Sequence, residues 1–412
     1  MRKRSSIRGI LPALALLIAG LLGVLMLGGC GGEPQVSIQD LIDAADREST
    51  IAIPAGTYRE HLYLLKSLTL VGDSSDPSQV IIQGIEDDRP AIYIVGDGTC
   101  QVTLQGLTIE SSKENGILVE RNARAHAEQV HVKDCQVSGF NVRGAASLTM
   151  VECTSTGNTR NGVSVVGDAN ATLVDCELRE CAAAGLAART TGEISVMEST
   201  VAENGEHGIK INGETTLVME NVTVERNGGG EPTAGAFVTL GTALSGNIDT
   251  GIYIEDDASV SMTNCTIADS ARDGIVIQDN ATVEARDCTI RGNARDGIVA
   301  ATDGSVTIHD CSITGNDLGI WLGKDGTFEM KRSTVQANGY GGVASIVATC
   351  VGPDVLQNPY RRTGPMSGGD NVIAPRGEAG SHDDFDCCPS GLCAVLRREL
   401  APPSDDSTGD DS

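Results

Sequence analysis

Short runs of alternating apolar and polar residues occupy most of this chain, and Gly, Asn and Asp separate the runs. Three such runs follow one another at 275–277, 283–285 and 288–290. Alternation over so few residues predicts strands with one buried face, and the turn residues between the runs exclude helices.

The pattern returns about every 23 residues, in three columns that share one phase. The glycine column is Gly116, Gly162, Gly185, Gly208, Gly251, Gly274, Gly297, Gly319 and Gly342. The cysteine column is Cys153, Cys176, Ser199, Val222, Cys265, Cys288, Cys311 and Ser333. The asparagine column is Asn158, Cys181, Asn204, Asn227, Asn247, Ser270, Asn293, Asn316 and Asn338. A chain that repeats at one interval builds a solenoid.

Three strands per repeat predict an all-β fold, a parallel β-helix over residues 50–350 with roughly a dozen coils about 4.8 Å apart. In such a fold Cys265, Cys288 and Cys311 are immediate neighbours along the axis. Stacked asparagines satisfy one another and the backbone through their side-chain amides, so we expect the coil of Cys181 to lack this link. The repeat loses phase at 228–246, where we expect a displaced loop within a coil.

The open end of a β-helix exposes unpaired strand edges that promote aggregation, and the segment before the first strand is expected to cover this end. Apolar residues at helical spacing follow Ser37, a suitable N-cap: Ile38, Leu41, Ile42 and Ala45. We therefore predict a capping helix over residues 37–48, at the end of a linker that begins at residue 30.

The segments 50–60 and 64–72 resemble the first coil of the right-handed parallel β-helix superfamily, the pectate-lyase-like fold. The resemblance extends over residues 36–350. It implies the fold and leaves the activity open, because enzymes, adhesins and binding proteins all use this scaffold.

Residues 1–29 have the charge and length of a secretory signal, with four basic residues before an apolar run at 10–27. Its end, Leu27-Gly-Gly-Cys30, resembles the lipobox of bacterial lipoproteins. The resemblance implies cleavage before Cys30, a lipid on Cys30 and a place in the bacterial cell envelope. Gly31 favours the outer membrane, because it is not the Asp of an inner-membrane retention signal. The alternative is a transmembrane anchor formed by the same apolar run.

The net charge of −26 repels phosphate backbones, so nucleic acid is not expected as a partner. Besides Cys30, four of the 13 cysteines fall outside the repeat, in or just before a Gly-, Pro- and Asp-rich extension at 351–400. They are Cys350, Cys387, Cys388 and Cys393, and we expect one or two disulfides among them. The acidic tail, 401–412, is expected to be disordered.

In a Gly-Ile-x-Ile strand the residue x points to solvent. The outward residues predicted in this way are Leu118, Arg143, Ser164, Ala187, Lys210, Tyr253, Val276, Val299, Trp321 and Ala344. The part from Tyr253 onward is apolar and holds the one Trp of the chain, so we predict an exposed binding stripe at Tyr253, Val276, Val299 and Trp321. A polysaccharide, a surface protein and the C-terminal segment folding back are the three candidate occupants.

Charged residues precede this stripe in successive repeats, at Asp249, Arg272-Asp273 and Arg295-Asp296. Carboxylates in register can recruit a cation, so Asp249, Asp273 and Asp296 are candidate ligands for calcium as a cofactor. Calcium-dependent polysaccharide lyases of the resembled fold use acidic ligands with an Arg or Lys base. The resemblance implies such roles for Asp273 and Asp296 with Arg272 or Arg295. The alternative is a charge ladder that solvates the surface.

Most repeats are a bare 22 or 23 residues, without the long loops that wall an enzyme cleft. This favours a binding or structural role over catalysis. The preferred interpretation is a lipid-anchored envelope protein that binds polysaccharide or a surface partner without chemistry of its own. The alternatives are a calcium-dependent polysaccharide lyase or related carbohydrate-active enzyme, and a structural spacer or adhesin rod.

Overall fold

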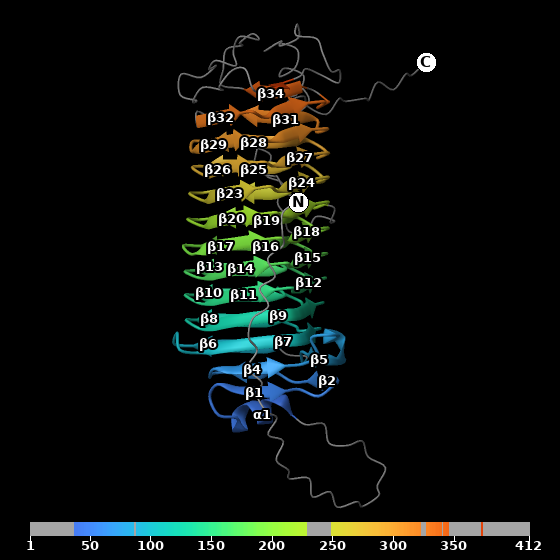
Figure 1. The fold of residues 1–412 in the computed structure, drawn as a ribbon, viewed down its shortest axis with the longest axis vertical. Coiled ribbons are helices and arrows are strands. Elements are labelled where there is room, and N and C mark those ends of the chain that lie inside the picture. Colours follow the sequence, from blue (N-terminus) through green and yellow to red (C-terminus); the bar gives the residue numbers. More distant parts are fainter. Residues whose placement is uncertain are drawn as a thin grey trace, which may run out of the picture. The chain divides into compact units, whose positions relative to one another are not determined.

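The computed structural model describes residues 37–85, 88–228, 249–322, 327–339, 341–345 and 372–373 (Figure 1). It confirms the predicted fold class, an all-β parallel β-solenoid of about 11 turns. Cys30, Cys350, Cys387, Cys388 and Cys393 lie outside the described residues, as do the expected signal peptide and acidic tail. Within the described ranges no helix is long and apolar enough to cross a membrane.

One sheet, here called sheet B, takes one strand from each coil, and all its strand pairs are parallel. Its twelve strands are β3 (Leu62–Leu64), β6 (Ile92–Gly96), β8 (Ile117–Arg121), β10 (Phe140–Gly144), β13 (Val163–Gly167), β16 (Ala184–Thr190), β19 (His207–Asn212), β22 (Ile252–Ile254), β25 (Ile275–Asp279), β28 (Asp296–Thr302), β31 (Leu318–Leu322) and β34 (Gly341–Ser345).

The other sheet, sheet A, takes two runs from each coil, which β7 and β9 join into single long strands. The first run is β1 (Ser49–Ala52), β4 (Leu68–Val71), β7 (Gln101–Glu110), β9 (Arg124–Lys133), β11 (Ser147–Val151), β14 (Asn170–Val174), β17 (Glu193–Met197), β20 (Thr216–Glu220), β23 (Ser259–Thr263), β26 (Thr282–Arg286), β29 (Ser305–His309) and β32 (Thr327–Lys331). The second run is β2 (Gly56–Arg59), β5 (Val80–Gln83), β12 (Thr154–Thr156), β15 (Glu177–Arg179), β18 (Thr200–Ala202), β21 (Thr223–Glu225), β24 (Thr266–Ala268), β27 (Thr289–Arg291), β30 (Ser312–Thr314), β33 (Thr334–Gln336) and β35 (Val372–Ile373). A 3-10 turn, Pro77–Gln79, precedes β5.

The glycine column marks a close approach between the backbones of successive coils. A Cβ on Gly274 would lie 2.6 Å from the carbonyl oxygen of Gly297, and one on Gly251 would lie 2.6 Å from that of Gly274. Backbone contact at this distance leaves no room for a side chain, which explains the column. Gly139 also belongs to it, between Gly116 and Gly162, and fills what the sequence pattern leaves as a double step.

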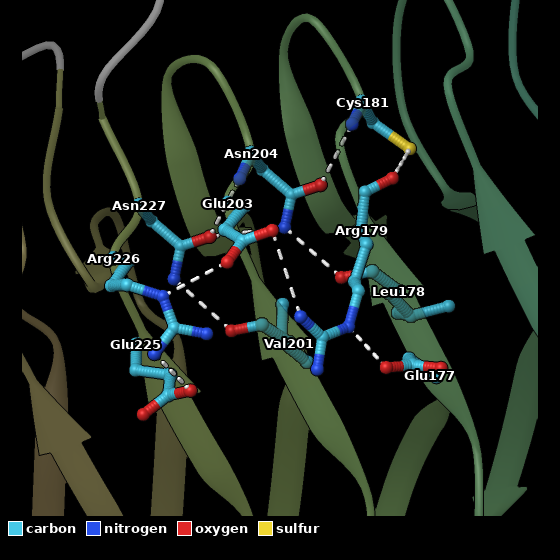
Figure 2. Close-up of polar contacts among 10 residues, drawn as sticks. All are labelled: Glu177, Leu178, Arg179, Cys181, Val201, Glu203, Asn204, Glu225, Arg226 and Asn227. Carbon is cyan, nitrogen blue, oxygen red and sulfur yellow. Dashed lines mark hydrogen bonds and ion pairs between the residues drawn. The ribbon is translucent and has the colours of Figure 1, made fainter.

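The asparagine column forms a buried ladder of amides (Figure 2). Asn204 donates from Nδ2 to the Oδ1 of Asn227 at 3.0 Å and to the carbonyl of Leu178 at 3.2 Å. At Cys181 the ladder is interrupted, as predicted: the Nδ2 of Asn158 meets only the Ser155 hydroxyl at 3.0 Å and the Cys181 sulfur at 3.6 Å. Each amide in the ladder satisfies a buried backbone group, and this requirement keeps the residue type constant.

The cysteine column is confirmed as well. Thr266 pairs with Thr289 and Thr289 with Ser312, so Cys265, Cys288 and Cys311 are stacked in consecutive coils. All three thiols are free and buried. Buried thiols without a polar partner side chain pack as small apolar groups, so the column acts as an apolar ladder.

The predicted capping helix exists and is shorter than expected: α1 spans Ile38–Ala44. Ser37 caps it by accepting from the Asp40 amide at 3.2 Å, and the Glu60 carboxylate accepts from the Ile38 amide at 2.8 Å. Ile38 and Ile42 are fully buried in the core. The helix ends early because Ala45 is already extended, with φ −72° and ψ 148°.

The loss of phase after Asn227 is an insertion within one coil. Ile209 pairs directly with Ile252, and Thr223 pairs directly with Thr266, so no coil is lost. The register makes Ser270 the direct neighbour of Asn227, because Ala271 donates from its amide to the Asn227 carbonyl at 2.9 Å. The placement of Asn247 in the asparagine column is therefore wrong, and residues 229–248 lie outside the described ranges.

Candidate binding face on sheet B

One column of outward residues runs along sheet B, and we call it the outward column. Its register is Tyr63, Tyr93, Leu118, Asn141, Ser164, Ala187, Lys210, Tyr253, Val276, Val299, Trp321 and Ala344. Asn141 stands where the sequence pattern placed Arg143, a correction that follows from Gly139. Gly139 directly precedes β10, so the outward position falls two residues earlier than expected and Phe140 is buried.

The predicted stripe is exposed only in part. Tyr253 and Trp321 are partly exposed, but Val276 has 0% exposure and Val299 has 4%. The prediction that these two valines face solvent is wrong. In the ladder they stand between the longer side chains of Tyr253 and Trp321, and a short side chain between longer ones keeps little accessible surface.

Tyr253, on β22, is the centre of a polar cluster. Its hydroxyl is 3.0 Å from Glu255 Oε2 and 3.0 Å from Gln278 Oε1. Lys210, its ladder neighbour on β19, places its ammonium 5.2 Å from the ring centroid and 3.9 Å from Glu255 Oε1. The ammonium is attracted both to the face of the ring and to the carboxylate. We call Lys210, Tyr253, Glu255 and Gln278 the tyrosine cluster.

His207 supports this cluster from the coil below. Its ring stacks on that of Tyr253, with centroids 5.2 Å apart and an interplanar angle of 21°. Its Nδ1 lies 3.0 Å from the Thr250 hydroxyl. Burial, and then the charge of Lys210, lower the pKa of His207 to about 3, so the ring is neutral near pH 7. His207 is a supporting residue that fixes the orientation of the Tyr253 ring.

Burial is also the main cause that raises the pKa of Tyr253 above its ordinary value, followed by the charge of Glu255. The phenol therefore remains protonated near pH 7 and acts as a hydrogen-bond donor. A ring edge, one donor hydroxyl, an ammonium and a carboxamide are groups that bind sugar hydroxyls and ring faces. Because these side chains contact one another, none of them is placed as a free general base.

The Arg-Asp pairs that precede the stripe have a structural role. Asp273 is 2% exposed, and its Oδ1 accepts from the Asp296 amide of the next coil at 3.1 Å. Asn115 and Asn161 occupy the same place in earlier coils and accept from the amides one repeat later, at 3.2 Å each. Asp273 thus makes a link between coils, which disfavours its expected role as a solvent-facing catalytic or ligand carboxylate.

The structure does not gather Asp249, Asp273 and Asp296 into a calcium site. Within the described ranges no group of three or more His, Cys, Asp or Glu side chains is placed to hold a metal ion. Burial raises the pKa of Asp249, and Arg272 opposes this shift. The backbone amide of Arg295 donates to the Arg272 carbonyl at 2.9 Å. The Arg-Asp pairs therefore belong to a turn that is stacked from coil to coil.

The sequence pattern missed Tyr63, Tyr93 and the His207–Tyr253 contact. Ile92-Tyr93-Ile94 has the same Ile-x-Ile form as Ile252-Tyr253-Ile254, and this signal could have identified Tyr93. The first coils depart from the 23-residue period, so the strand of Tyr93 was not aligned with the later repeats. The contact of His207 with Tyr253 crosses the insertion and has no signal in the sequence.

The chain belongs to the right-handed β-helix family, whose model for the right handed beta helix region matches residues 90–248 and 231–358. This confirms the superfamily that the first coil indicated. No curated protein sequence matches the chain.

Among the solved structures that share the fold are two A-modules of mannuronan C-5 epimerases from Azotobacter vinelandii. The AlgE4 module is 15% identical with a TM-score of 0.56, over 72% of this chain and 88% of the module. The AlgE6 module is 13% identical with a TM-score of 0.60, over 82% of this chain and 93% of the module. At these identities the similarity establishes the fold.

Proposed function

We propose that the protein is a lipid-anchored β-helix protein of the bacterial cell envelope that binds a polysaccharide along the outward column of sheet B. The tyrosine cluster carries this proposal. It presents a partly exposed aromatic ring whose orientation is fixed by His207, with a cation and two polar side chains beside it. Rigid aromatic surfaces with adjacent hydrogen-bonding groups suit sugar rings, which have apolar faces and hydroxyl edges.

The fold supports the same function class. The two similar modules belong to enzymes that, by name, act on mannuronan, a polysaccharide. The described coils of this chain are mostly bare, so a ligand reaches sheet B without passing a long loop from those coils. Binding without catalysis is favoured because Tyr253 and Lys210 both contact Glu255, so these groups are engaged with one another and are not free to transfer a proton.

Calorimetric titration of the full-length protein with a panel of neutral and acidic glycans tests the proposal. Tyr253→Ala should weaken binding about tenfold, since it removes the ring and its hydroxyl, and Trp321→Ala should weaken it less. Val218→Ala, at an exposed residue of sheet A, is the matched control and should change nothing. The absence of binding to any glycan, or an equal loss in the control, would contradict the proposal.

A second candidate is a polysaccharide lyase or related carbohydrate-active enzyme, favoured by the convergence of Lys210, Tyr253 and Glu255. Such a reaction needs a base that removes a proton from the sugar. The raised pKa of Tyr253 opposes this role. Ultraviolet absorbance of unsaturated uronates, with pectate or alginate and calcium, distinguishes the two. A signal that Tyr253→Phe abolishes would establish the enzyme, and a spacer rod would show neither signal nor binding.

The envelope anchor has its own test. Metabolic labelling with an alkynyl fatty acid should modify the wild-type protein and not Cys30→Ser, because the thiol of that residue is the expected lipid site. Labelled protein should fractionate with the outer membrane. Equal labelling of Cys30→Ser would contradict the anchor and leave the glycan-binding proposal in place.

A further inference from the structure

Side chains close the N-terminal end of the solenoid. Gln39 of α1 donates from Nε2 to the Tyr63 carbonyl at 3.5 Å, and its Oε1 accepts from the Tyr63 amide at 2.7 Å. Lys66 donates to the carbonyls of Asp43 and Ala45, at 3.2 and 2.5 Å. The side-chain amide of Gln39 thus satisfies the outer edge of β3 as a further strand would, and α1 is fixed on the first coil (Figure 1).

The most exposed large hydrophobic side chain of the described residues lies at this end. Leu65 directly follows β3, the first strand of sheet B, and is 64% exposed. Leu41 of α1 is partly exposed as well. The contacts of Lys66 with the last turn of α1 place the turn that carries Leu65 beside the helix. We call Leu41, Leu65 and Lys66 the N-terminal tip.

The expected lipid site is close to the tip along the chain. Residues 31–36 separate Cys30 from Ser37, the N-cap of α1. An extended chain of this length spans at most about 25 Å. The solenoid has about 11 turns, which at about 4.8 Å each extend over roughly 50 Å. A lipid on Cys30 therefore keeps the tip at the membrane surface, and the tether is too short to let the tip leave it.

The other exposed large hydrophobic side chains of the described residues do not form a lateral membrane face. Val166 is 41% exposed on β13 of sheet B, and Val218 is 37% exposed on β20 of sheet A, so the two belong to different faces. Ile85, 41% exposed, lies between β5 and β6 in the second coil, near the tip. A solenoid lying flat on a membrane needs apolar residues aligned along one face.

The charge of the first coil identifies the kind of lipid surface that fits it. Residues 37–66 carry five carboxylates and three cations: Asp40, Asp43, Asp46, Glu48 and Glu60, with Arg47, Arg59 and Lys66. The excess of carboxylates repels anionic headgroups. A zwitterionic headgroup offers an ammonium to these carboxylates and a phosphate to Lys66, whose aliphatic stem suits the boundary between water and acyl chains.

We propose that the N-terminal tip is a membrane-contact surface that rests on a zwitterionic bilayer, so that the axis of the solenoid points away from the membrane. The inference rests on the proposed lipid anchor and adds the orientation of the protein to it. Leu65 enters the boundary between headgroups and acyl chains. Sheet B then extends away from the bilayer and is open to a ligand along its length.

Quenching of a reporter tryptophan by brominated lipids tests this orientation. The full-length protein, lipidated on Cys30, is reconstituted into vesicles of phosphatidylethanolamine and phosphatidylcholine brominated on its acyl chains, with Trp321→Phe to remove the native reporter. Leu65→Trp in this background should lose roughly half of its emission, because shallow insertion brings the ring to the brominated chains. Val166→Trp and Val218→Trp, the matched exposed positions, should keep theirs. Added phosphatidylglycerol should reduce the quenching of Leu65→Trp.

The outcomes separate the contact from the anchor. Equal quenching of Val166→Trp or Val218→Trp means that the solenoid lies along the membrane, and it overturns the proposal. So does vesicle-bound protein in which Leu65→Trp is not quenched, or is quenched more strongly with phosphatidylglycerol. Protein that carries no lipid and stays off the vesicles contradicts the anchor itself. Leu65→Trp changes an exposed residue, so its urea midpoint should equal that of the Trp321→Phe background.

Discussion

The buried ladders and the outward column follow the same coil register, yet they use it in opposite ways. Inside, Gly, Cys and Asn recur because each coil imposes the same contact on the next, as the Asn204–Asn227 link shows (Figure 2). Outside, the residue changes at nearly every step, from Tyr93 through Lys210 to Trp321. Constancy therefore marks the positions where one coil contacts the next, and the outward positions are free of that constraint.

This difference predicts that the largest stability effect comes from the glycine column. Gly274→Ala should lower the free energy of unfolding by about 3 kcal/mol or more, because its Cβ would lie 2.6 Å from the Gly297 carbonyl oxygen. Gly339→Ala is the control, since its Cβ would meet nothing closer than 3.5 Å. Urea unfolding measures both, and equal stability of the two variants would refute the close-contact explanation.

His207 lies at the boundary between the buried interior and the outward column. Its burial in the neutral form should make the protein less stable in acid. Its folded pKa of about 3 lies below the unfolded value of about 6.5, so the unfolded chain binds the proton first. Its contribution is complete above pH 6.5 and falls by about 1.4 kcal/mol per pH unit down to about pH 3. His207→Gln should flatten this part of the stability profile relative to wild type. A parallel profile would show that the ring is not buried neutral.

The interruption of the asparagine ladder at Cys181 offers a substitution that should increase stability, and this tests the explanation of the buried ladders. Cys181→Asn should restore the amide link between Asn158 and Asn204 and stabilise the protein by about 1 kcal/mol. Cys176→Asn is the matched control, because it buries an amide in the thiol column and should destabilise. Thermal unfolding of both variants tests whether the effect on stability depends on the position of the new asparagine in the ladder or on the residue type alone. A loss of stability in Cys181→Asn would contradict the ladder.

The smallest effect is expected for the ion pairs that cover the same coils. Arg226 lies 2.9 Å from Glu203 Oε1, with both side chains well exposed (Figure 2). Arg226→Gln should change the free energy of unfolding by no more than about 0.5 kcal/mol, because solvent screens the pair. The difference should vanish in high salt. A loss as large as that of Gly274→Ala would erase the distinction between interior and surface.

Much of the fold was predictable because its determinants repeat. The period indicated the solenoid, and the columns indicated the stacking of Cys265 and the interruption at Cys181. The candidate face was predictable at Tyr253 and Trp321 and not at the valines between them. Exposure depends on the lengths of neighbouring side chains, which the period does not record.

The sequence by itself determined the period and the stacking of most coils, since a repeated local environment selects the same residue in each turn. Only the tertiary structure decided which side chains meet across coils, such as His207 and Tyr253, and which carboxylates face inward, such as Asp273. The physical reason is that strand pairing follows from local alternation, whereas burial and side-chain contacts arise only when several coils are stacked.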